Sequence, residues 1–176
     1  MKKILFFTCV MALIASTAFA HDMTKRIGLG FISTDSPIGI RYWLSPKVGL
    51  DLGFGIRVDD NAGGSGESAT DWSLSGGLPI NLITIADRVN LHFLPWVQYT
   101  NLDFVTDTGS QFDIVAALEF EVFVTKDLSV SASHGVDFQM FSPPGNGDSE
   151  TDINTFGANI TDFGVHYYLG SSGGGE

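Results

Sequence analysis

The chain has 176 residues with nine Lys and Arg against 20 Asp and Glu, and its net charge of −11 makes nucleic acid an unsuitable partner. Intrinsic disorder is excluded as well, because 44% of the residues are hydrophobic, Phe alone occurs 14 times, and the charges cluster between apolar segments. The length fits a single domain.

Residues 1–20 have the pattern of a cleaved secretory signal peptide. Lys2 and Lys3 form a positively charged start, residues 4–14 are apolar, and Ala18-Phe19-Ala20 is a small-residue cleavage site. The apolar run is shorter than the roughly 20 residues that a membrane-spanning helix needs. Removal would leave residues 21–176 with a net charge of −11 − 2 = −13, and it would also remove Cys9, the only cysteine. We therefore expect no disulfide, cysteine metal site or cysteine nucleophile in the mature chain.

From residue 26 onward the dominant pattern is period-two alternation, which predicts strands with one apolar and one polar face. Residues 48–58 alternate in this way, and residues 70–81 and 111–125 repeat the design. A tilted strand needs roughly 9 to 11 residues to cross a bilayer, whereas strands of soluble proteins mostly have 5 or 6. The length of these segments therefore favours a membrane barrel.

The whole chain, interpreted in this way, contains eight strands. An even number with no helical period between them predicts an up-and-down antiparallel meander, and closure into a barrel removes both exposed edges. The expected fold class is thus all-β, an eight-stranded antiparallel up-and-down transmembrane β-barrel over residues 21–169, followed by a flexible tail at 170–176. The predicted strands are residues 26–33, 37–45, 47–58, 70–81, 88–104, 111–125, 128–141 and 155–169.

Two predicted strands break the alternation. Pro95 should interrupt the fifth, since proline cannot donate to the strand ladder. In the last strand the apolar side changes between Ile160 and Phe163, which predicts a β-bulge near Thr161 and Asp162. The register at both places stays open.

The connections differ between the two ends of the predicted barrel, with short turns at residues 45–47 and 125–127 and longer acidic loops at 59–69, 105–110 and 142–154. This asymmetry is typical of an outer-membrane barrel, although the outer connection at 34–36 is short and the inner one at 81–88 is long. Basic residues fall near the inner rim: Lys25, Arg26, Lys47, Arg88 and Lys126. Acidic residues fall in the outer loops: Asp59, Asp60, Glu67, Asp107, Asp148, Glu150 and Asp152.

Aromatic residues cluster towards strand ends, where two interfacial girdles of an outer-membrane barrel would lie. The alternative is that they are ordinary core aromatics of a soluble barrel. The predicted girdle residues are Tyr42, Trp43, Trp72, Trp96, Tyr99, Phe104, Phe112, Phe138, Phe141, Phe156, Tyr167 and Tyr168.

Two segments carry a family resemblance. Residues 39–47 (GIRYWLSPK) with Gly49 to Gly55 resemble the second and third strands of small outer-membrane barrels of the OmpA/OmpX type. Residues 163–169 (FGVHYYL) are similar to the last strand that those proteins present to the barrel-assembly machinery, although there it usually ends on an aromatic residue and here Leu169 is followed by a tail. The resemblance implies a fold, the cell outer membrane, and lipids and lipopolysaccharide as partners. It implies no activity.

Polar residues on the inner side of the predicted strands are candidates for the lumen. The interior of an eight-stranded barrel is just wide enough for its side chains, so we expect a salt-bridged plug and not a channel. A narrow gated pore or proton path is the alternative. The predicted lumen residues are Arg41, Asp51, Arg57, Asp71, Glu119, Glu121, Asp137, Gln139 and His166.

One acidic loop resembles part of a calcium site. Asp148, Glu150, Asp152 and Asn154 have the alternate spacing of oxygen ligands in a calcium loop. However, Ile153 takes the place of the turn glycine, and Asn159 that of the final glutamate. We therefore expect a solvated loop with at most weak divalent-cation association and no metal site.

Ser133, His134 and Asp137 are the residue types of a catalytic triad, but alternation places His134 outside and the other two inside, where no relay can form. Lipid A deacylases of the outer membrane use a lipid-facing His with a Ser two residues later, where this chain has Val136.

Gly28-x-Gly30 and Gly53-x-Gly55 open no helix and are interpreted as close-packing glycines, not as a nucleotide site. No catalytic or cofactor-binding residue is predicted.

The expected function is that of a monomeric integral outer-membrane protein, which is not an enzyme and which acts structurally or through adhesion and binding by its acidic loops. The alternatives are a narrow channel for small solutes, a lipid A-modifying enzyme, and a soluble periplasmic barrel that binds a lipophilic ligand.

Overall fold

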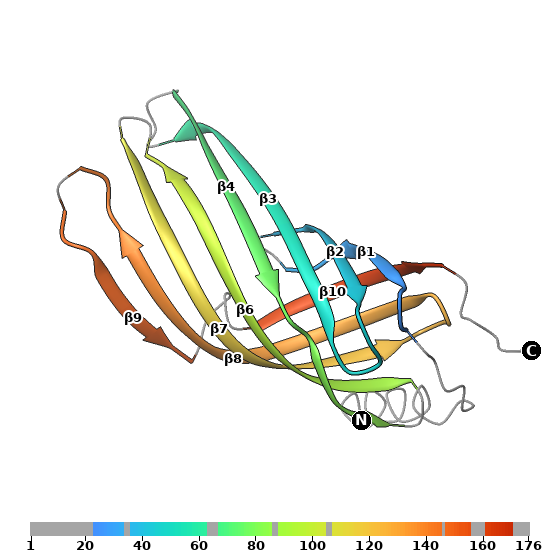
Figure 1. Ribbon diagram of the computed structural model, residues 1–176. Coiled ribbons are helices and arrows are strands. Elements are labelled where there is room, and N and C mark those ends of the chain that lie inside the picture. The colour runs from blue at the N-terminus through green and yellow to red at the C-terminus, as the bar shows by residue number, and fades with distance from the viewer. Residues whose placement is uncertain are drawn as a thin grey trace, which may run out of the picture.

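Figure 1 presents the computed structural model, which describes residues 23–33, 36–62, 67–85, 88–104, 107–145, 147–155 and 161–170. These residues form strands and turns, and no helix among them is long and apolar enough to cross a membrane. The predicted signal peptide lies outside the described residues, as do Phe156, Asn159 and Ile160.

The described residues form a closed eight-stranded antiparallel barrel, so the predicted fold class is confirmed. Closure comes from β10, which pairs with β1 on one side and with β8 on the other. Ten strand segments make up the eight strands of the barrel, because two of the strands are interrupted. β4 and β5 both pair with β6 and together form one strand, and β9 and β10 both pair with β8 and together form another. The strands are β1 (Ile27–Phe31), β2 (Ile38–Trp43), β3 (Gly49–Ala62), β4 (Glu67–Gly77), β5 (Ile80–Ile85), β6 (Val89–Asp103), β7 (Thr108–Phe123), β8 (Leu128–Ser142), β9 (Glu150–Asn154) and β10 (Thr161–Leu169).

The period-two pattern explains which side of each strand faces inward. Along β7, Asp113, Val115, Ala117, Glu119 and Glu121 are buried, whereas the residues between them are exposed. β10 alternates in the same way over its whole length. Glycines allow the closest approach at the closing seam, where a methyl group on Gly30 would overlap the Val165 carbonyl oxygen. The polar side of the strands therefore fills the barrel, and the apolar side forms its exterior.

The predicted interruption of the fifth strand is wrong, because β6 runs unbroken through Pro95. The break lies in the neighbouring wall, at Leu78 and Pro79 between β4 and β5. The Pro95 carbonyl accepts a hydrogen bond from the Leu78 amide, 3.0 Å between N and O. In an antiparallel pair the N–H and C=O of one residue point to the same neighbour, so the donor that Pro95 lacks would face this break.

The last wall also differs from the prediction of a small bulge at Thr161 and Asp162. β9, which was expected to be loop, pairs with the outer half of β8, and Asn154 lies opposite Asp137. β10 pairs with the inner half of β8, and Thr161 lies opposite His134. This wall is therefore made by two separate strand segments, β9 and β10, and not by one strand with a β-bulge at Thr161 and Asp162.

The strands differ greatly in length, which opens the outer end of the barrel. β1 and β2 have 5 and 6 residues, whereas β3, β6, β7 and β8 have 14 to 16. β9 and the ends of β3, β4, β6, β7 and β8 that extend past β1 and β2 form a curved open sheet, here named the projecting sheet (Figure 1). In the described part of the chain, β9 pairs with β8 alone, and the end of β3 pairs with β4 alone.

Candidate functional site

The centre of the barrel holds a network of buried charges around Arg41. From β2, the guanidinium donates to both carboxylate oxygens of Asp51 on β3, at 2.8 and 2.7 Å. It also donates to both oxygens of Glu119 on β7, at 2.8 and 3.1 Å. Glu121 is 3.6 Å from Nη1 of Arg41, and Nδ1 of His92 on β6 lies 2.9 Å from Glu119. These five residues, Arg41, Asp51, His92, Glu119 and Glu121, are named the Arg41 cluster.

Neutral hydrogen-bond donors complete the network around Glu121. Oε1 of Glu121 accepts hydrogen bonds from Ser129 on β8 and from Tyr168 on β10, both at 2.7 Å. The indole of Trp43 in turn donates to the Tyr168 hydroxyl at 3.4 Å. The network thus connects β2 and β3 on one side of the barrel with β7, β8 and β10 on the other.

The Arg41 cluster has the properties of a plug. Its five side chains are buried, and they contact one another directly across the interior. One guanidinium faces three carboxylates, so the arrangement depends on Arg41 for most of its compensating charge. Paired and hydrogen-bonded charges are the form in which ionised groups are retained inside proteins.

Arg26 closes the inner end of the barrel. Its guanidinium donates to the Lys126 and Tyr168 carbonyl oxygens, at 2.9 and 3.0 Å, and pairs with Asp127. The side chain also lies over the Tyr168 ring, 5.7 Å from its centroid. Sequence reasoning placed Arg26 at the inner rim, and the structure places it there as a buried group.

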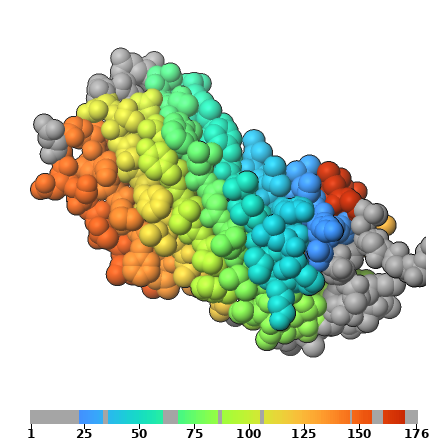
Figure 2. Space-filling view, in the orientation of Figure 1, coloured from blue at the N-terminus to red at the C-terminus, as the bar shows by residue number. Residues whose placement is uncertain are grey.

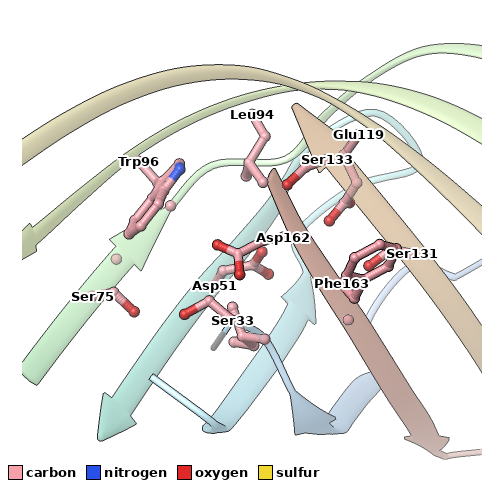
Figure 3. A pocket seen from close by; sticks show the side chains of 14 residues that line it. Ser33, Asp51, Ser75, Leu94, Trp96, Glu119, Ser131, Ser133, Asp162 and Phe163 are labelled. Carbon is pink, nitrogen blue, oxygen red and sulfur yellow. The ribbon is translucent and has the colours of Figure 1, made fainter. Parts of the chain in front are cut away.

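A small cavity lies beside the Arg41 cluster (Figure 3). Its volume of about 30 Å³ is enough for one or two water molecules. The lining is mixed, with Leu94 and Trp96 as apolar groups and Asp51 and Glu119 as acidic ones. Asp162 and the hydroxyl groups of Ser33, Ser75, Ser131 and Ser133 also belong to the lining. The cavity suits bound water better than an organic substrate.

A larger space lies within the projecting sheet. It has a volume of about 280 Å³ and is lined by Arg57, Asp71, Gln98, Thr100 and Gln111, among others. Arg57 lies opposite Asp71 in the register, yet the two form no ion pair in the described structure. Asp71 instead accepts a hydrogen bond from the Asp103 amide at 2.9 Å.

Most of the predicted lumen residues lie where the alternation placed them. Arg41, Asp51, Glu119, Glu121, Asp137 and His166 are buried in the interior. Asp71, Arg57 and Gln139 also fall on the inner face, but the first two belong to the open projecting sheet and not to a salt-bridged plug. The plug therefore contains fewer residues than the sequence predicted for the lumen.

Several interior residues were missed by sequence reasoning, namely His92, Gln98, Asp113, Ser129, Trp43 and Tyr168. Pro95 obscured the phase of its strand; had the alternation been followed through it, His92 and Gln98 would have fallen on the inner face. Trp43 and Tyr168 were assigned to the girdles, but both are buried in the interior. The exterior aromatics Tyr99, Phe104, Phe112, Phe138 and Tyr167 do face outward.

His134 lies on the exterior, as the alternation predicted. Its Nδ1 is 2.8 Å from the hydroxyl of Thr161 on β10, a partner that the sequence did not reveal. Asp137 points inward from the same strand and is buried. The three residue types of a catalytic triad are therefore divided between the two faces of β8.

The acidic loop is not organised as a metal site. Glu150, Asp152 and Asn154 belong to β9, so their alternate spacing is that of a strand. Among the described residues, no three His, Cys, Asp or Glu side chains gather as they would around a metal ion.

Comparison with protein-family models, with curated proteins and with solved structures finds no match to this chain. Function therefore has to be argued from the barrel itself.

Proposed function

We propose that the chain is an integral protein of a bacterial outer membrane that acts structurally and through interactions of its acidic outer end. The observation that carries this proposal is the inverted distribution of side chains, with ionised groups inside and large apolar groups outside. Ile38, Ile56 and Phe163 are each at least 60% exposed, whereas Arg41 and Glu121 are fully buried. A water-soluble barrel would bury such apolar side chains, and an extended apolar surface marks contact with a partner or a membrane.

The apolar exterior continues around the barrel. Figure 2 shows β3, β4, β6, β7 and β8 forming one unbroken wall, and exposed apolar side chains occur on each of them. They include Leu52, Leu74, Phe93, Leu118 and Val130. A band of this kind around a closed barrel with a polar interior is the pattern of transmembrane β-barrels.

We expect the mature protein to remain with the membranes after osmotic shock and to require detergent for extraction. We also expect it to migrate faster on a denaturing gel when unheated than when boiled, because a closed membrane barrel resists cold detergent. Cell fractionation followed by electrophoresis measures both properties. Release of folded protein into the shock fluid would instead favour a soluble periplasmic barrel.

The surface role rests on the outer end of the molecule. Asp59, Asp60, Asp107, Asp148 and Asp152 are exposed there, whereas Lys47 and Lys126 lie at the opposite end. The projecting sheet adds two edges, on β3 and β9, and sheet edges can pair with an added strand.

The Arg41 cluster weighs against the narrow channel, because it occupies the lumen that a solute would have to cross.

The orientation can be tested because the mature chain has no cysteine. We expect an Asp148→Cys variant to react with a membrane-impermeant maleimide on intact cells. A Lys126→Cys variant serves as the control, since its side chain is also exposed in the folded barrel, at 78%, but should react only after lysis. Labelling of both variants, or of the control alone, on intact cells would overturn the proposed orientation.

A further inference from the structure

Two buried carboxylates lie next to each other on the inner face, outside the Arg41 cluster. Asp113 on β7 and Asp137 on β8 are each 1% exposed. In the strand register Asp137 lies opposite Val115, two residues along β7 from Asp113, so the two carboxylates are diagonal neighbours on one face. Asp137 takes part in none of the ion pairs of the described residues.

The partners of the two groups are very unequal. Asp113 accepts hydrogen bonds from the Gln111 amide at 3.0 and 2.9 Å, and from the Gln139 amide at 3.4 Å. Both carboxylate oxygens of Asp137 have no hydrogen-bond partner among the residues that the structure describes. A buried carboxylate without a donor or a counter-charge is costly, and a second carboxylate beside it raises that cost.

We propose that Asp113 and Asp137 bind a divalent cation, calcium in the first place, on the inner face of the barrel. The surrounding groups are hard oxygen donors, as this ion requires. Gln139 and Gln111 can present their amide oxygens by a simple flip of the side-chain amide. Asn154 lies opposite Asp137 on β9 and adds a further amide on the same face.

Calcium fits this set better than zinc or magnesium. The site offers neither thiolate nor imidazole, which zinc prefers. Its donors come from flexible side chains on three strands, and calcium accepts six to eight oxygen ligands in irregular geometry, whereas magnesium demands a near-ideal octahedron. The exposed Asp152, opposite Gln139 on β9, adds negative charge that would attract a cation to the opening.

A bound cation would have a structural effect, because it would connect β7, β8 and β9. β9 is the edge of the projecting sheet and pairs only with β8 among the described strands. The site shares only Asn154 with the acidic spacing of residues 148–154, because its two carboxylates come from β7 and β8. It also depends only on the fold and not on the proposed membrane location.

Terbium luminescence provides a direct probe, because Tb³⁺ replaces Ca²⁺ and emits when a nearby tryptophan is excited. Trp96 lies opposite Val115, which lies opposite Asp137, so two strand spacings of about 4.8 Å separate the indole from the site. We expect the refolded mature protein in detergent to give sensitised Tb³⁺ emission that added CaCl₂ reduces. Asp137→Asn should abolish this emission, whereas the control Asp152→Asn should retain it.

Thermal unfolding separates a cation site from a carboxyl group that is simply protonated. With EDTA, Asp137→Asn should have a higher Tm than the natural protein, because it removes repulsion without removing a hydrogen bond. With CaCl₂ the order should reverse, because only the natural protein gains from binding. Trp96→Phe should lose most of the Tb³⁺ emission but keep the calcium-dependent rise in Tm. Equal Tm values for Asp137→Asn and the natural protein in both buffers, or undiminished emission from Asp137→Asn, would overturn the proposal.

Discussion

Replacing Arg41 by methionine is expected to lower the free energy of unfolding by about 3 to 5 kcal/mol, the cost of removing one partner from a buried ion pair. Asp51, Glu119 and Glu121 would then be left in the interior without the guanidinium that contacts all three. Urea titration of the barrel in detergent or lipid vesicles measures the change. A loss of this size is a large part of the stability of an ordinary domain.

Arg57→Met is the matched control, because Arg57 is also on the inner face but forms no ion pair with any described residue. Its expected effect is within about 0.5 kcal/mol. Adding Asp51→Asn and Glu119→Gln to Arg41→Met should recover part of the lost stability, since these changes remove charges that have become uncompensated. Equal costs for Arg41→Met and Arg57→Met would show that the Arg41 cluster contributes nothing particular to the barrel.

The sequence allowed the fold and the inner side of most strands to be predicted, because both follow from local alternation. Arg41, Asp51 and Glu119 fall on the polar side of regular strands, and the structure brings them together. Their actual partners could not be derived, since β2 and β7 are distant in the chain and their distance across the lumen depends on how the barrel closes.

The errors occurred where a local rule competed with a contact between strands. Pro95 is a strand breaker in isolation, but here the neighbouring wall breaks at Leu78 and Pro79 instead. Trp43 and Tyr168 have the composition of girdle residues, but they fill the inner end of the barrel beneath Glu121. β9 was missed because its acidic residues resemble a loop, although an exposed strand at the edge of a sheet tolerates charge well.

An arginine in place of Leu118 tests the lipid contact itself. Leu118 is 49% exposed and lies midway along the outward row of β7, between Phe112 and Val124. If the exterior faces hydrocarbon, Leu118→Arg should lower the free energy of unfolding in lipid vesicles by about 2 to 4 kcal/mol, the cost of a charge near the bilayer midplane.

Val124→Arg is the control for Leu118→Arg, because Val124 is similarly exposed, at 44%, but lies at the turn that ends this row. Near an interface the same charge should cost only about 0 to 1 kcal/mol. A surface that faces water would give both variants small and equal effects, since exposed substitutions usually change stability by no more than about 0.5 kcal/mol. The difference between the two positions therefore reports depth in the membrane, and a difference near zero would contradict a membrane-spanning barrel.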